Sequence, residues 1–90
     1  MNNLRRKHIK QIIAMFEGIS DEIDNARDCL NTVLEGEQEA YDNMPDNLKY
    51  SSRGEDFENV IGEMESITGD AEALTDAIGD LISSLESFIV

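Results

Sequence analysis

The stretch from Phe57 to Ile89, FENVIGEMESITGDAEALTDAIGDLISSLESFI, decides the fold of this 90-residue chain. Apolar residues recur in it at alternating spacings of three and four, in two sets. The first row holds Phe57, Met64, Ala71, Ile78 and Leu85, and the second row holds Val60, Ile67, Leu74, Leu81 and Phe88. Such spacing keeps one stripe of a helix facing a partner helix. The stretch is therefore predicted to be a long helix that packs against another helix.

The first half of the chain repeats this pattern and supplies the partner helix. Its first row holds Ile9, Phe16, Ile23, Leu30, Glu37 and Met44, and its second row holds Ile12, Ile19, Ala26, Val33 and Ala40. Pro45 lacks the amide that a continuing helix would use, so this helix should stop just before it. Ser52, followed three residues later by Glu55, fits a capping box at the start of the next helix. The sequence predicts a first helix over about 5–43, a connection over 44–52 and a second helix over about 53–89.

The short connection favours antiparallel neighbours, so the fold class is an all-α, coiled-coil-like hairpin that forms one domain over residues 1–90. Pairing residues whose numbers sum to about 100 sets Leu30 opposite Ala71 and Ala26 opposite Leu74, and such large-to-small pairs favour this register. Glu37 does not suit a core row. We expect its carboxylate at the solvent edge, or else a distortion of the first helix after Gly36.

A third set of apolar residues, the flank, lies beside the predicted seam. It consists of Ile13, Leu34, Tyr41, Ile61, Ile82 and Ile89. Exposed apolar patches of this kind mark interaction sites. The flank is therefore predicted to bind a second copy, which would complete a four-helix bundle, or a different protein.

Acidic residues dominate the charge, with 20 acidic and 7 basic residues and a net charge of −13. The first ten residues contain Arg5, Arg6, Lys7 and Lys10 and no acid, so the remainder has twenty acids against three basic residues, a net charge of −17. Such a field repels nucleic acid and anionic lipid, and attracts basic protein surfaces. The basic start is expected to be neutralised within the chain or by another subunit.

The acidic residues of the outward face are the second candidate surface for a partner. The predicted contacts are Asp24, Asp28, Glu35, Glu39, Glu65 and Glu72. This face either keeps the protein in solution or mimics a phosphate backbone, with carboxylates along a rod that fits the basic groove of a nucleic-acid-binding protein.

No motif in the sequence carries catalytic, cofactor or metal chemistry, so we expect a protein that is not an enzyme. The only histidine, His8, lies in the basic start, and the only cysteine, Cys29, lies near acidic residues. One cysteine excludes an intramolecular disulfide framework and is typical of a reducing compartment. No run approaches the roughly 20 apolar residues of a membrane span. These features predict a cytoplasmic protein.

The segment Glu37 to Asn47, EQEAYDNMPDN, followed by SRGE at Ser52 to Glu55, resembles a linker motif of small acidic helical proteins encoded by phages, prophages and related elements of Gram-positive bacteria. The resemblance covers the end of the first helix, the connection and the start of the second helix. It implies a mobile-element setting in a bacterial host and suggests that the protein binds and blocks a host defence protein. Together with the acidic face, this gives the leading hypothesis of an inhibitor of a host defence or nucleic-acid-handling protein. The alternative hypothesis is a structural module for oligomerisation or assembly that has no enzyme target.

Overall fold

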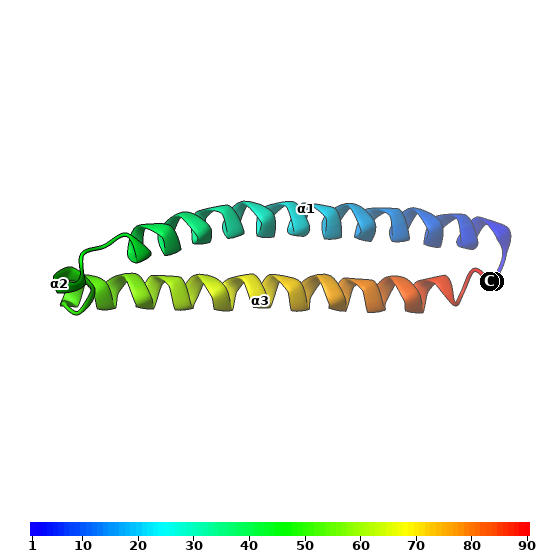
Figure 1. Cartoon of the computed structure of the whole chain (residues 1–90). Helices are drawn as coiled ribbons and strands as arrows, with labels where there is room; N and C mark the ends of the chain where they lie inside the picture. Colours follow the sequence, from blue (N-terminus) through cyan, green and yellow to red (C-terminus); the bar gives the residue numbers. More distant parts are fainter.

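The structure is a computed structural model that describes all 90 residues. It contains α1 (Asn3–Asp42), the single turn α2 (Asp46–Lys49) and α3 (Ser52–Glu86), and no strand. The two long helices lie side by side and antiparallel, with α2 at the end where the chain turns back (Figure 1). The result is a rod of 69 × 15 × 14 Å. The prediction of an all-α hairpin from the apolar rows is confirmed.

The ends of α1 follow from local side-chain chemistry. The side chain of Asn2 accepts a hydrogen bond from the backbone amide of Arg5 at 2.8 Å, so the helix is capped and begins two residues before the predicted start. At the other end α1 stops at Asp42, with Asn43 as its C-cap, just ahead of Pro45. The proline therefore ends the helix where the sequence indicated that it would.

The connection is more ordered than predicted, and the predicted capping box is wrong. Ser52 is already the first residue of α3, and the N-cap is Ser51, whose side chain makes no capping hydrogen bond. Its hydroxyl instead donates to the carbonyl oxygen of Leu48 at 2.5 Å and so ties α3 to the preceding turn. The spacing of three to Glu55 selected Ser52, but the helix begins one residue earlier than that spacing requires, so the capping box does not form.

Gly54 allows α2 to pack against the first turn of α3. It is the only buried glycine, and a Cβ atom at this position would lie 2.5 Å from the carbonyl carbon of Lys49. Every other glycine has open space around the corresponding position. The close turn between α2 and α3 therefore requires a residue without a side chain at 54.

Two hydrogen bonds between the long helices fix their register. Thr75 Oγ1 donates to Asp24 Oδ1 at 3.3 Å, and the Tyr41 hydroxyl donates to the carboxylate of Glu58. The residue numbers of each pair sum to 99. The predicted antiparallel register is confirmed to within one residue.

The predicted choice of rows for the seam is wrong. The buried apolar side chains are Ile13, Ile61 and Ile78, which are 7%, 8% and 6% exposed, and the first two belong to the flank. The seam is therefore built from the first row and the flank, with Leu30 and Ala71 half-buried within it. The second row is exposed along both helices, including Ala26 and Leu74. Second row and flank lie on either side of the first row at equivalent heptad spacings, so spacing alone could not distinguish them.

Candidate interaction surfaces

The flank residues lie inside the hairpin, not on an open surface. Ile13 and Ile61 are buried, and the remaining members, Leu34, Tyr41, Ile82 and Ile89, are half-buried. They contribute to the contact between α1 and α3, and a partner could reach them fully only if the hairpin opened. The prediction that the flank is an exposed surface for a partner is therefore wrong.

Tyr41 illustrates the structural role of the flank at the loop end. Its hydroxyl donates to Glu58 across the seam, and the Lys49 ammonium lies 5.5 Å from the centre of its ring. The hydrogen bond to Glu58, with a smaller contribution from burial, raises the pKa of the Tyr41 hydroxyl above its usual value. These contacts join α1, α2 and α3 at the end of the rod.

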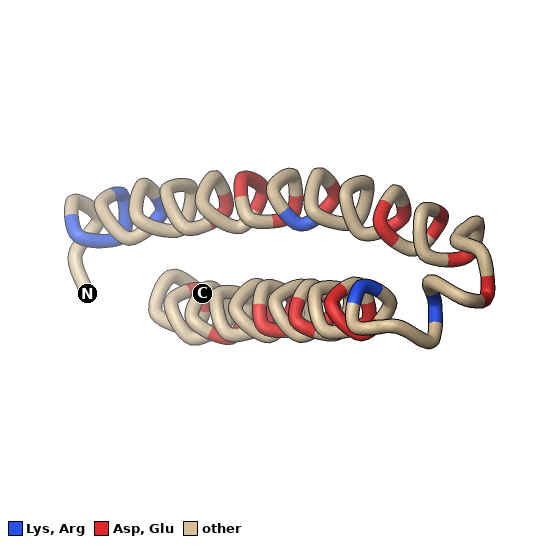
Figure 2. Tube along the Cα trace, turned by 90° about the vertical axis from the view of Figure 1, so that its left-hand side faces the viewer, with Lys and Arg blue, Asp and Glu red and all other residues tan.

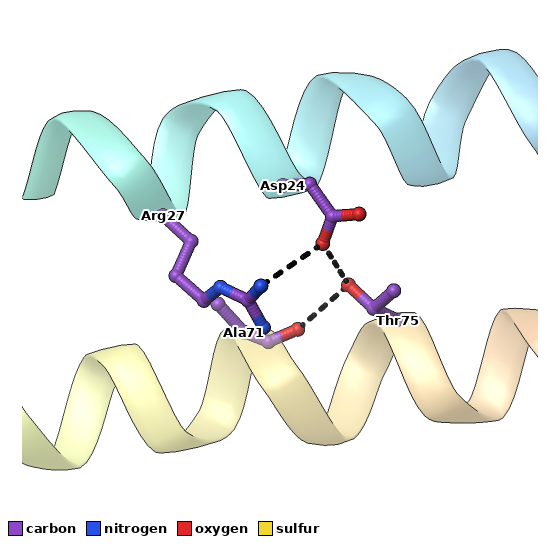
Figure 3. Close-up of polar contacts among 4 residues, drawn as sticks. All are labelled: Asp24, Arg27, Ala71 and Thr75. Atoms are coloured by element: carbon purple, nitrogen blue, oxygen red, sulfur yellow. Dashed lines mark hydrogen bonds and ion pairs between the residues drawn. The ribbon is translucent and has the colours of Figure 1, made fainter. Parts of the chain in front are cut away.

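Asp24 is the one acidic candidate that the structure places within the seam. It is half-buried, lies 3.6 Å from the guanidinium of Arg27 and accepts the hydrogen bond from Thr75 (Figure 3). The Thr75 hydroxyl is also 3.1 Å from the carbonyl oxygen of Ala71, so its one proton is shared between two acceptors. Asp24 is thus already engaged inside the hairpin, unlike the acidic surface residue that the sequence predicted.

The other acidic candidates remain on the surface. The exposed carboxylates among them are Asp28, Glu35, Glu39, Glu65 and Glu72. The only ion pair of the structure joins Arg27 to Asp24, so none of these five carboxylates is neutralised by a neighbouring side chain. They are free to meet a basic surface or solvent.

The second row is the largest apolar feature that nothing covers. Its exposed large residues are Ile12, Ile19, Val33, Val60, Ile67, Leu74, Leu81 and Phe88, between 39% and 54% exposed. The accessible surface of the chain is 6446 Å², whereas a compact folded protein of 10.1 kDa exposes about 5,300 Å². The excess of about 1,100 Å² is similar to what one partner buries in a standard protein interface, about 800 Å².

A small cavity of about 150 Å³ opens beside the second row at the loop end. It is lined by Glu37, Asp56, Phe57 and Val60, and its wall is almost entirely apolar. Glu37 is half-buried at this site, and α1 continues as a regular helix through Gly36 to Asp42. The half-buried position of Glu37 agrees with the expected place at the solvent edge. The alternative, a helix distorted after Gly36, is wrong.

The charges of the rod are segregated along its length. Arg5, Arg6, Lys7 and Lys10 gather at the N-terminal end of α1, and acidic residues dominate the rest of both helices (Figure 2). None of these four basic side chains forms an ion pair, although the C-terminal end of α3, whose last residue is Glu86, lies at the same end of the rod. Neutralisation of the basic start within the chain is therefore not seen.

The side chains that could act as nucleophiles, bases or metal ligands do not cluster. Cys29 is a free, exposed thiol, His8 is exposed, and no three histidine, cysteine, aspartate or glutamate side chains come together as a metal site requires. Neither long helix contains an apolar stretch of the length that a bilayer crossing needs. No protein-family model matches the chain, and no curated protein or solved structure is significantly similar to it.

The sequence contained a signal for the exposed row that the heptad assignment missed. Each helix carries three apolar rows, whereas a two-helix seam can use only two of them. The heptad positions between the flank residues are occupied by Ser20, Arg27, Thr68 and Thr75, so the line of the flank is less apolar than the second row. A row that is apolar throughout and yet lies outside the hairpin is the pattern of a bundle with more than two helices.

Proposed function

We propose that this chain is a non-enzymatic protein-interaction module that self-associates through its second row into a four-helix bundle. The observation that carries the proposal is the continuous exposure of the second row on both helices. Only three apolar side chains are buried in the hairpin, and so small a core gives marginal stability to an isolated domain. Covering the second row with two further helices would supply the missing apolar burial.

The test is the oligomeric state of the chain and its dependence on the second row. Sedimentation or light scattering should find a dimer, and the double variant Leu74→Glu/Leu81→Glu should be a monomer. Met15→Glu is the matched control, because Met15 is apolar and 67% exposed but lies outside the row. The wild type should also melt at a temperature that rises with protein concentration. A wild-type chain that is monomeric at high concentration and melts independently of concentration would overturn the proposal.

A second candidate function is the binding of a basic protein by the acidic surface. It is supported by the five exposed, unpaired carboxylates along a 69 Å rod, which can follow an extended basic groove. The resemblance of the Glu37 to Asn47 segment to proteins of mobile elements suggests a bacterial cytoplasm and a host defence or nucleic-acid-handling protein as the target. In that case the protein would act as an inhibitor by occupying the target's nucleic-acid site.

This candidate is tested with carboxylates that do not stabilise the hairpin. The variant Asp28→Asn/Glu35→Gln/Glu39→Gln should lose the capture of a basic protein from a Gram-positive bacterial lysate while its helicity stays unchanged. The captured complex should weaken steeply as salt is raised, because the contact is electrostatic. Equal capture by this variant and by the wild type would reject a role for the acidic surface.

A further inference from the structure

We infer that the second copy packs with its loop at the opposite end of the rod, so that Arg5 of each copy enters the loop-end cavity of the other. This inference rests on the proposed self-association and adds its orientation and its specific contact. The first ten residues carry four basic side chains and no acid, whereas residues 35–65 around the turn carry ten acids and two basic residues.

The two ways of pairing the hairpins differ in which ends meet. If the loops lie at the same end, the two acidic loop ends lie together and the two basic starts lie together, and both contacts are repulsive. If the loops lie at opposite ends, each basic start meets an acidic loop end. The basic side chains have no ion-pair partner within their own chain, so the second arrangement gives them one. Charge complementarity of this kind sets orientation more than it sets total affinity.

The geometry of the second row leads to the same arrangement. Arg5 occupies the position seven residues before Ile12, so it continues the line of the second row toward the N-terminus. The middle of α1 lies between Glu22 and Ile23, and a two-fold axis there sets Arg5 of one copy opposite Ala40 of the other. The register within the hairpin places Ala40 beside residues 59–60 of α3. Arg5 therefore arrives at Val60, which lines the cavity.

The same axis keeps the apolar members of the row in contact. Along α1 it pairs Ile12 with Val33 and Ile19 with Ala26 of the other copy. Along α3 the register of the hairpin places the axis between Asp76 and Ala77. Leu74 and Leu81, like Ile67 and Phe88, then fall within two residues of facing each other. A full overlap of the two rods thus stacks the second rows in layers and buries their whole length, which any large shift along the rod would reduce.

The cavity has the chemistry that an arginine side chain needs. Phe57 and Val60 offer an apolar wall for the methylene stem, and the acidic side chains of Glu37 and Asp56 place two negative charges beside it, to which the planar guanidinium can turn. A first-row glutamate among apolar residues is then explained, because its charge is satisfied across the dimer. Lys10 lies outside the second row, so it would remain in solvent.

Distances between spin labels on the two copies test the orientation. With Cys29→Ser as background, a label at Asn47→Cys in α2 marks the loop end and a label at Asn3→Cys marks the other end. Two Asn47 labels in one dimer should be separated by nearly the 69 Å length of the rod, and a mixture of the two singly labelled chains should give a short distance. A short distance between Asn47 labels overturns the inference but leaves the proposed dimer intact. A monomer instead contradicts the proposed function.

Charge exchange tests the contact itself. Arg5→Glu should weaken the dimer at least about tenfold, whereas Lys10→Glu, which makes the same change in charge, should have a much smaller effect. Adding Asp56→Arg to Arg5→Glu should restore affinity, and adding Asp28→Arg, which restores the same net charge on the outer surface, should not. Equal losses in Arg5→Glu and Lys10→Glu, or equal rescue by the two arginines, would overturn the contact.

Discussion

The seam of the hairpin and the second row are both built mainly from apolar residues, but the fold covers the seam and leaves the second row open. The seam includes Ser20, Arg27, Thr68 and Thr75 at its middle, and its apolar ends are buried or half-buried. The second row has no polar residue between Ile12 and Val33 or between Val60 and Phe88, and it is exposed. Polar groups in the seam can fix the register, because only one alignment pairs them. This chain therefore places the polar residues that set the register inside the hairpin and leaves its most apolar row outside.

The largest effect should come from truncating a buried side chain of the seam. Ile78 is 6% exposed, and Ile78→Ala should lower the free energy of unfolding by about 2–5 kcal/mol. Ile67 is 54% exposed, so Ile67→Ala should cost little in dilute protein and progressively more as dimers form. Urea unfolding at several protein concentrations, followed by circular dichroism, measures both. An equal cost for the two variants in dilute solution would show that the two rows do not differ as described.

The next effect concerns the turn that holds the seam in alignment. Gly54→Ala places a methyl group against the backbone of Lys49, which cannot move as a side chain could, and should destabilise the protein by about 1–3 kcal/mol. Gly62→Ala is the matched control in the same helix. It meets open space and should stabilise the protein by up to about 1 kcal/mol through helix propensity. Thermal unfolding should therefore shift in opposite directions for the two variants, and a shift in the same direction would contradict the tight turn.

The sequence was sufficient for the helices, their antiparallel register and the turn at Pro45, because these depend on periodicity and on the missing amide of proline. It was insufficient for the face on which the helices meet. The first row can form a stripe with the second row or with the flank, and the choice depends on side-chain packing and on pairs such as Asp24 with Thr75. The sequence also predicted that Asp24 is exposed, because its position in an ideal heptad lies beside the seam and faces solvent.

The polar middle of the seam should have a smaller effect than its apolar ends. Asp24→Ala removes the ion pair with Arg27 and the acceptor for Thr75, but the carboxylate is 41% exposed and solvent screens it. We expect a loss of up to about 1 kcal/mol that diminishes in high salt. Asp28→Ala, an exposed change of the same charge, should not destabilise the protein. The two variants are compared by urea unfolding at low and high salt, and an equal response would remove the polar contact from the account of the register.

The smallest effect should be at Tyr41, where the seam meets the turn. The Glu58 carboxylate raises the pKa of the Tyr41 hydroxyl, so the folded state holds this proton more tightly than the unfolded chain does. The stability from this hydrogen bond is complete below the ordinary tyrosine pKa of 10.0 and is lost as the pH rises through the higher folded value. In a Tyr50→Phe background, the tyrosinate absorbance should therefore appear at higher pH in folded protein than in urea. Adding Glu58→Gln should reduce the difference, since it removes the charged acceptor. If the Tyr41 hydroxyl titrates at the same pH in folded and unfolded protein, its hydrogen bond to Glu58 does not form in solution. The contacts of the seam would then end before they reach the turn.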